Sequence, residues 1–400
     1  MADRLLPIIH GNKVTFEFEH PNATMLNVLG TFNHWDINSG VMEKGADGIW
    51  RKTVDVPLEG SYDYKFIADG EWILDPLNPD YGKDSRDRYN SRFQITTSAS
   101  AVDHLRRIAI GLENNPPGGD FNERKKLFEL ADTMLQLPSA GYSRVLKNHL
   151  VERIESLTKK LTIKEDSFVA GVYCHGFAIQ SAGKSFGLDI VTTRSVYGMY
   201  WDLPSKTIEG LADQFDCICA SHLHPDHWDH LLMKYVIARG GKVLVPSAIA
   251  GRFPDGAVSV KPEETVDVFG WKVTFHSGQH VYDDQNKLIL NYYEVLTPDC
   301  KRIVHTSDHD YTTGVKRGGD IDLLIAKAGG VNPVFEGRGK DAFINLLLHL
   351  KPNKFIAGHL NELGHPIKGG REPYKTGIEI VESARNRNGE ILHWGETWKL

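Results

Sequence analysis

The first part of the chain alternates hydrophobic and polar positions, which predicts β-strands. Residues 14–18 and residues 49–58 show this period of two, in which every second side chain is apolar. Residues 62–67 and 71–74 flank an Asp-Gly turn, a pattern typical of a β-hairpin. Short strands at this spacing predict a small antiparallel β-sandwich over residues 1–97.

The next part of the chain, residues 98–165, has a helical pattern instead. Apolar residues recur at helical spacing over residues 102–112, and two prolines followed by two glycines at 116–119 end that helix. Helical patterns resume over residues 122–135 and 144–160. We interpret this charge-rich segment as a helical linker that bridges two domains.

Residues 166–400 alternate short apolar runs with helical patterns, which predicts one large domain of mixed α/β structure. The runs expected to form strands are residues 168–173, 177–181, 185–191, 216–220, 242–245, 272–275, 288–295, 302–305, 323–326 and 354–356. The stretches expected to form helices are residues 231–239, 339–350 and 376–385. The chain is therefore predicted to be a multidomain protein.

Length and composition agree with this organisation and exclude several classes of protein. A chain of 400 residues is too long for one ordinary domain, and two or three folded units are expected. With 41% hydrophobic and 24% charged residues, the composition excludes a mostly disordered chain. A net charge of −6 gives no overall attraction to nucleic acid or to an anionic membrane, so neither is expected as a partner. The composition leaves the oligomeric state open.

Targeting signals and cysteine usage bear on the cellular compartment. The apolar stretch at the N-terminus is too short for a signal peptide, and no run of 18 apolar residues could span a membrane. The four cysteines, Cys174, Cys217, Cys219 and Cys300, form no CxxC pair, and we interpret them as reduced, inert, buried thiols. Together these features favour a cytoplasmic protein.

The 18 histidines are the unusual feature of the composition, and some of them are clustered. His222, His224, Asp226 and His227 follow the apolar strand at residues 217–220. Because residues two apart in an extended segment face the same way, His222 and His224 can bind one metal ion. Asp226 and His227, where the chain turns into a helix, can reach a second ion. Imidazole nitrogens with a carboxylate suit zinc, and also manganese or iron.

This HxHxDH pattern after a strand resembles the signature of the metallo-β-lactamase fold superfamily, and the resemblance covers about residues 166–400. It implies an αββα catalytic domain with further ligands in chain order. Asp189, after an early strand, matches the family's buried aspartate, which orients the ligand loop. Asp308, after an apolar strand and a small residue, matches the carboxylate that bridges two metal ions.

Two of the implied ligand positions have alternatives. His280 is favoured as the third ligand of the first ion because it lies beyond a strand end, and His276 is the alternative. His359 directly follows a late strand and is favoured for the second ion, with His365 as the alternative. The resemblance thus implies one ion on His222, His224 and His280, a second on Asp226, His227 and His359, and Asp308 between them.

The resemblance implies a binuclear metal-dependent hydrolase with two divalent ions, in the first place zinc, with manganese or iron as alternatives. A hydroxide that bridges the ions would attack an ester, a lactone or a phosphodiester. Asp308 would hold the spacing of the ions and Asp226 would orient the hydroxide, so both are predicted to be catalytic. His224, where a glutamate would indicate a di-iron redox site, favours hydrolysis. The alternative is a non-catalytic glycan-binding scaffold with a structural metal site.

Basic residues gather in the C-terminal glycine-rich stretches, where they could receive a phosphate or carboxylate of the substrate. They are Arg338, Lys340, Lys368, Arg371 and Lys375. A solvated loop surface is the alternative interpretation of this cluster.

A second resemblance covers residues 12–97. The run from Asn27 to Trp35, followed by an Asp-Gly-Ile-Trp turn and the hairpin that ends at Trp72, is similar to the glycogen-binding module of the AMP-activated kinase β subunit and the isoamylase N-terminal domain. Apolar faces of sugar rings pack on aromatic rings, whereas hydroxyls seek short polar partners. The implied sugar-binding residues are Trp35, Lys65, Trp72 and Asn90.

The module is expected to bring the catalytic domain to glycogen or another α-glucan, with a small-molecule or oligosaccharide-linked substrate. The sequence departs from the kinase pattern over residues 85–89, where the kinase module has a loop that caps the sugar. The alternative is a domain that keeps the fold for packing and does not bind sugar.

Overall fold

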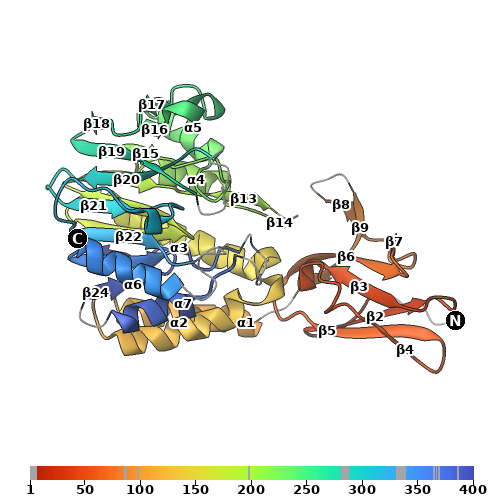
Figure 1. Ribbon diagram of the computed structural model, residues 1–400. Helices are drawn as coiled ribbons and strands as arrows, with labels where there is room; N and C mark the ends of the chain where they lie inside the picture. The colour runs from red at the N-terminus through yellow and green to blue at the C-terminus, as the bar shows by residue number, and fades with distance from the viewer. Residues whose placement is uncertain are drawn as a thin grey trace.

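The computed structural model describes most of the chain in three consecutive regions: a β-sandwich, three helices and a large α/β domain (Figure 1). The described residues are 7–84, 88–96, 99–196, 199–280, 288–329, 339–363, 365, 367, 370–384 and 387–400.

The N-terminal region consists of two antiparallel sheets packed face to face. One has the strand order β1 (Ile8–His10), β2 (Lys13–Glu19), β5 (Ile49–Asp55), β4 (Glu43–Lys44). The other has the order β3 (Leu26–Gly30), β6 (Gly60–Ala68), β9 (Tyr89–Ile95), β8 (Tyr81–Lys83), and β7 (Glu71–Ile73) pairs with β6. The alternating apolar residues point inward, so that Phe16, Tyr64, Phe66 and Phe93 share one core. The predicted β-sandwich is confirmed.

The helical segment lies between the sandwich and the α/β domain and is packed against both. It contains α1 (Ala99–Asn114), α2 (Phe121–Leu135), the short 3-10 helix η2 (Pro138–Tyr142) and α3 (Arg144–Thr162). Its apolar stripes join the core of the α/β domain. Arg124 on α2 is fully buried and pairs with Glu390 and Glu396, which lie more than 260 residues further along the chain. These contacts fix the helices to the α/β domain.

The sandwich is attached to this helical segment by direct contacts. Gly60 on β6 pairs with Ser143, the residue that precedes α3, and the backbone N–H of Arg144 donates to the Glu59 carbonyl oxygen at 3.0 Å. Arg144 also forms an ion pair with the Glu59 carboxylate. Leu58 of the sandwich belongs to the core of the α/β domain. The module is therefore docked on its neighbours as well as connected to them by the chain.

The α/β domain is built from two mixed sheets of seven strands. The first has the order β17 (Val258–Val260), β16 (Lys242–Pro246), β15 (Cys217–Cys219), β12 (Lys184–Leu188), β11 (Gly176–Ser181), β10 (Phe168–Tyr173), β25 (Thr397–Lys399). The second has the order β18 (Thr265–Val268), β19 (Trp271–Gly278), β20 (Leu290–Leu296), β21 (Arg302–His305), β22 (Leu323–Lys327), β23 (Lys354–Gly358), β24 (Asn388–Glu390). Apolar side chains of both sheets, such as Ile179 and Phe275, form one core between them.

Helices cover the outer faces of the two sheets (Figure 1). On one side, α5 (His230–Ala238) packs on β15 and β16, and α4 (Ser205–Ala212) packs on α5 and α3. On the other side, α7 (Tyr374–Ser383) packs on β23 and β24, next to α6 (Gly339–Leu350) and α2. This is the αββα arrangement expected for residues 166–400, and the predicted multidomain fold is confirmed.

Strand direction brings the carboxyl ends of several strands to one edge of the domain. β12, β15 and β16 are parallel, as are β21, β22 and β23. β19 and β21 are both antiparallel to β20 and so run the same way. Ligands in open α/β sheets bind outside the carboxyl ends of strands. A hairpin of β13 (Thr193–Val196) and β14 (Met199–Asp202) extends from the α/β domain toward the sandwich (Figure 1).

The structure bears on two expectations about the whole chain, the absence of a membrane span and the burial of the cysteines. Among the described residues, no helix is long and apolar enough to cross a membrane. The four cysteines are free, and Cys217 and Cys219 are buried as expected, whereas Cys174 is half-buried and Cys300 is exposed. The interpretation of all four as buried thiols is therefore wrong for Cys300, which lies in the loop between β20 and β21.

Candidate metal centre

The residues expected to bind metal lie together at the carboxyl edge of the sheets, in two groups that share Asp308. In each group the ligand-type atoms lie within 4.8 Å of one another. One group contains His222, His224, His280 and Asp308, and the other contains Asp226, His227, Asp308 and His359. The residues come from loops after β15, β19, β21 and β23 and are separated by up to 137 positions in sequence.

Asp308 lies between the two groups and presents one oxygen to each. Its Oδ1 lies 3.3 Å from Nε2 of His227 and 3.2 Å from Nε2 of His359. Its Oδ2 lies 3.3 Å from Nε2 of His280. This division is the arrangement that a carboxylate bridging two ions requires.

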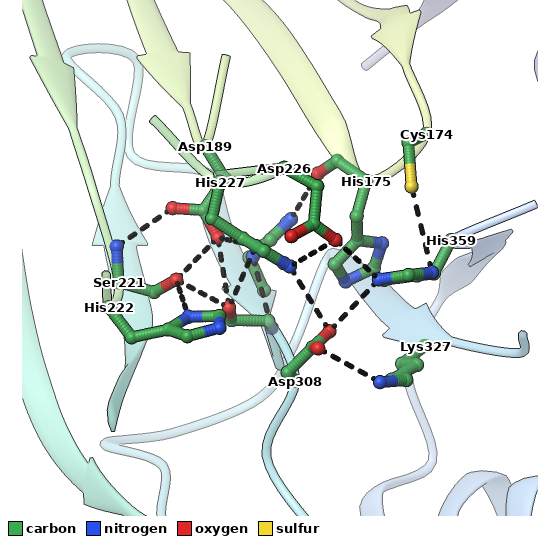
Figure 2. Close-up of polar contacts among 12 residues, drawn as sticks. Cys174, His175, Asp189, Ser221, His222, Asp226, His227, Asp308, Lys327 and His359 are labelled. Carbon is green, nitrogen blue, oxygen red and sulfur yellow. Dashed lines mark hydrogen bonds and ion pairs between the residues drawn. The ribbon is translucent and has the colours of Figure 1, made fainter. Parts of the chain in front are cut away.

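Asp189 orients the loop that carries the histidines (Figure 2). It is fully buried, follows β12 and accepts hydrogen bonds from the backbone N–H and the hydroxyl of Ser221 at 2.9 and 2.7 Å. Its Oδ2 lies 2.8 Å from Nδ1 of His227, and the hydroxyls of Tyr293 and Ser307 donate to it at 2.8 and 2.9 Å. With its Nδ1 held in this way, His227 turns Nε2 toward Asp226 and Asp308.

The other histidines are oriented by similar contacts. Nδ1 of His222 lies 2.8 Å from the Ser221 hydroxyl, and Nδ1 of His359 lies 3.6 Å from the Cys174 sulfur. In both residues Nε2 is thereby left to face the centre. A histidine that binds metal through one nitrogen is commonly held by a hydrogen bond at the other.

The donor set fits divalent cations. Within the described part of the chain, the buried Nε2 atoms of His222, His227 and His359 and the Oδ1 atom of Asp308 have no hydrogen-bond partner. Buried polar atoms are rarely left unsatisfied, and two cations, one in each group, would satisfy all four. Neutral imidazoles with two carboxylates are a donor set that suits zinc and, less strongly, manganese or iron.

The electrostatics of the site also favour positive charge at its centre. Burial would raise the pKa of Asp308, but the charges of Lys327, His359 and His227 hold that pKa well below its usual value. Burial would lower the pKa of His227, but Asp308 and Asp226 raise it well above its usual value. The Asp308 carboxylate thus stays ionised and attracts either a proton or a metal ion to this place.

The two alternative histidines lie elsewhere. Nδ1 of His276 is 2.9 Å from Glu263, its Nε2 is 3.9 Å from Glu294, and its ring packs on Tyr292. His365 pairs with Glu362 at 3.0 Å. Neither histidine belongs to the two groups around Asp308.

The basic cluster expected to receive an anion is not a single surface. Arg338 and Lys368 lie outside the described residues, and Lys340 and Lys375 are exposed at the starts of α6 and α7. Arg371 is buried, and its guanidinium donates to the backbone carbonyl oxygens of Leu135, Leu137, Leu363 and His365. Arg371 is therefore neither a receptor for a substrate anion nor part of a solvated loop surface, so both interpretations are wrong for it. It joins α2 and η2 to the loop after His359.

Sequence reasoning missed three residues at the metal centre. Lys327, the last residue of β22, is buried with Nζ 3.0 Å from Oδ2 of Asp308 (Figure 2). Cys174 and Glu362 form a group with Asp226 and His359 on the far side of the His359 ring. Cys174 follows β10 and Glu362 follows β23, just as the other residues of the site follow strand ends. This position after a strand was the only signal in the sequence that could have identified Cys174 and Glu362.

On the sandwich, the half-buried Trp35 and the exposed Trp72 form one aromatic surface. The ring centroids of Trp35 and Trp72 lie 6.0 Å apart at an interplanar angle of 50°, and Trp72 is 55% exposed. His34 and Trp35 have φ values of 54° and 60°, so two successive non-glycine residues adopt the left-handed conformation that turns the chain after the 3-10 helix η1 (Thr31–Asn33). Such strain is often found at binding sites.

The other two predicted sugar-binding residues lie on the same sheet. Lys65 alternates on β6 with the core residues Tyr64 and Phe66, so it faces outward. Asn90 lies on β9 and is only 4% exposed, which leaves it little surface for a sugar. Residues 85–87, in the segment that departs from the kinase pattern, lie outside the described residues.

Comparison with known proteins agrees with the resemblance of the N-terminal region. Residues 12–100 match the family model for the glycogen recognition site of AMP-activated protein kinase, so this prediction is confirmed. A curated relative, the amyloplastic phosphoglucan phosphatase DSP4 of Castanea sativa, is 25% identical over 114 residues. The match covers 28% of this chain and only about a quarter, 26%, of the relative.

Several solved structures are similar to this one at low sequence identity. The isothiocyanate hydrolase from Delia radicum gut bacteria has 17% identity and a TM-score of 0.45, covering 58% of this chain and 98% of that one. Igni18, a metallo hydrolase from Ignicoccus hospitalis, has 14% identity and a TM-score of 0.43, covering 58% and 98%. The di-iron β-hydroxylase CmlA from Streptomyces venezuelae has 14% identity and a TM-score of 0.44, covering 94% and 76%.

Proposed function

We propose that this chain, in which a metallo-β-lactamase fold follows a glycogen recognition module, is a binuclear metal-dependent hydrolase directed to α-glucan by that module. The observation that carries the proposal is that two groups of metal-binding side chains share one carboxylate, Asp308. Zinc is the first candidate for the metal, with manganese or iron as alternatives.

Two divalent ions at such a site supply a nucleophile from water at neutral pH and polarise the oxygen of the bond to be broken. The chain's own residues have separate tasks. Asp308 would hold the separation of the two ions through its two oxygens. Asp226, whose Oδ2 lies 3.4 Å from Nε2 of both His227 and His359, would accept a proton from the attacking water and orient it.

The position of His224 indicates where the substrate enters. It is partly exposed, whereas the other six proposed ligands are buried. The substrate would therefore reach the ions from the side of His224. An ester, a lactone or a phosphodiester has the polarised oxygen and the leaving group that this arrangement can use.

A structural metal site in a non-catalytic scaffold is the competing interpretation. A structural zinc ion is usually enclosed by four ligands and has no open position. Here seven residues form two groups, one of which includes the partly exposed His224. This arrangement favours catalysis.

The proposed ligand set predicts how many metal ions the protein holds. The purified chain should contain close to two ions, and His280→Ala should lower this to about one because the first group loses a ligand. His276→Ala is the matched control, since His276 pairs with Glu263 and Glu294, and should keep both ions. Inductively coupled plasma mass spectrometry measures the content, and turnover of model esters measures activity. A wild-type protein with one ion or none would exclude the binuclear mechanism.

The proposed glucan role predicts a specific loss of binding. Trp35→Ala combined with Trp72→Ala should weaken binding of maltoheptaose at least about 30-fold, because truncating a tryptophan at the centre of a binding site typically costs about 2 kcal/mol or more. Isothermal titration calorimetry and sedimentation with glycogen both measure this. Hydrolysis of a small soluble ester should be unchanged, since neither tryptophan belongs to the two groups of metal-binding side chains.

Phe269→Ala provides the control, because it removes another exposed ring, which lies on the α/β domain. If the unmutated protein does not bind glucan, the module keeps its fold for packing alone, as its docked position would allow.

A further inference from the structure

Lys327 is the one lysine at the metal centre among the described residues. It ends β22, between the strands that lead to Asp308 and His359, and it is 2% exposed. Two hydrogen bonds fix its backbone. The Lys327 N–H donates to the Thr306 hydroxyl at 3.1 Å, and the Tyr311 hydroxyl donates to the Lys327 carbonyl oxygen at 3.0 Å. The side chain is therefore held in the site.

The ammonium of Lys327 contacts one particular oxygen of Asp308. Nζ lies 3.0 Å from Oδ2, whereas Oδ1 faces His227 and His359 (Figure 2). Oδ2 also faces His280. A carboxylate oxygen has two lone pairs, so Oδ2 can accept a hydrogen bond from Lys327 with one and coordinate the first ion with the other. The ammonium carries three N–H donors, and because it pairs only with Asp308 among the described residues, two donors remain for another acceptor.

The charges of the proposed ligand set make this position unusual. Two divalent ions bring four positive charges, against which Asp226 and Asp308 supply two negative ones, and the five histidines are neutral when bound to metal. A lysine here adds a further positive charge in a buried place. Like charges at such short range are unfavourable unless an anion joins them.

We propose that Lys327 binds the substrate's phosphoryl oxygen, which makes phosphate esters the substrate class of this centre. This proposal rests on the proposed hydrolase function. It narrows the possible substrates from esters, lactones and phosphodiesters to phosphate esters. A phosphoryl group offers several oxygens around one phosphorus, enough to meet both ions and the ammonium together, whereas a carboxylate has two. In the reaction, the oxygen of water bonds to phosphorus, the P–O bond to the alcohol breaks, and the alcohol leaves with a proton.

The test compares phosphate binding and substrate preference in Lys327→Met, which keeps the length of the side chain and removes its charge. In the metal-loaded protein, the Kd for inorganic phosphate should rise about 10- to 100-fold, the usual effect of losing a hydrogen bond to a charged group. Calorimetry measures this. The kcat/KM for the monoester p-nitrophenyl phosphate, which has three non-bridging oxygens, should fall about 10-fold more than that for the neutral ester p-nitrophenyl acetate.

Two controls separate this role from others. Lys126→Met removes the same charge from the exposed surface of α2 and should not change phosphate affinity. Lys327→Arg keeps a positive charge and should retain more phosphate affinity than Lys327→Met. Metal content is measured in every variant.

Three outcomes overturn the proposal. Equal losses on the charged and neutral esters, together with lost metal, would mean that Lys327 only holds Asp308. Unchanged phosphate affinity in Lys327→Met would exclude the contact. Wild-type protein that binds phosphate more weakly than about 1 mM would exclude an anion site whatever the variants do. If phosphate binds through Lys327 but no ester is hydrolysed, the hydrolase function fails and the anion site remains.

Discussion

Replacing Asp308 by alanine is expected to remove both metal ions and to lower kcat/KM for any ester by at least about 1,000-fold, or about 4 kcal/mol. Both oxygens of Asp308 are in use, one toward His227 and His359 and the other toward His280 and Lys327. Its loss would also leave the buried Lys327 ammonium without the carboxylate that pairs with it, and this charge would repel incoming cations.

Metal content and turnover, measured on the same preparation of Asp308→Ala, test this expectation. Asp310→Ala is the matched control, because Asp310 lies two residues away and caps the short 3-10 helix η4 (Tyr311–Thr313) through the Thr312 N–H. That variant should keep two ions. Turnover retained by Asp308→Ala would mean that the bridging position is assigned to the wrong residue.

Replacing Asp189 by alanine is expected to destabilise the fold by about 3–5 kcal/mol, the usual result of removing one member of a buried charged network. Ser221, His227, Tyr293 and Ser307 would lose their shared acceptor. Metal affinity should also fall about 10- to 100-fold, because the contact that orients His227 lies outside the ligand shell and such contacts have effects of this size.

Chemical denaturation and metal titration measure the two effects of Asp189→Ala. Asp299→Ala is the control, because Asp299 also accepts hydroxyl bonds, from Ser167, Ser181 and Thr297, but is exposed and far from the histidines in the fold. It should lose less stability and no metal. Undiminished metal affinity in Asp189→Ala would show that His227 is oriented without it.

Much of the site could be predicted from sequence because its strongest signal is local. His222, His224, Asp226 and His227 occupy one loop after one strand, so spacing alone brings them together. Asp308 and His359 could be proposed because each also follows an apolar strand. The choice between His276 and His280 needed the structure, since Glu263 and Glu294 draw His276 away from the centre.

Residues whose partners are distant in sequence could not be predicted. Lys327 ends an apolar run and resembles a lysine that leaves a strand for solvent, yet Asp308 on the neighbouring strand holds it inside. Arg371 resembles a surface cation among glycines, but carbonyl oxygens of Leu135 and Leu137, more than 230 positions earlier in the chain, bury it. Composition and periodicity contain no information about such pairings.

The fold, too, depends on contacts between residues that are far apart in the sequence. Alternation and the Asp-Gly turn predicted β2, β5, β6 and β7 of the sandwich but not the short strands β1, β4 and β8, and helical spacing predicted α1, α2 and α3. Neither pattern predicted that Arg124 on α2 would pair with Glu390 and Glu396. The helices were therefore expected to act as a linker, whereas in the structure they join the core of the α/β domain.

The docking of the sandwich on the helical segment has a consequence for how the chain would handle a polymer. A module on a flexible tether raises the local concentration of its ligand over a wide volume. Here the pairing of Gly60 with Ser143 and the burial of Leu58 hold the module in place. A glucan bound at Trp35 and Trp72 would then meet the metal centre at a set number of sugar units from its anchor, so the module would select a position along the polymer.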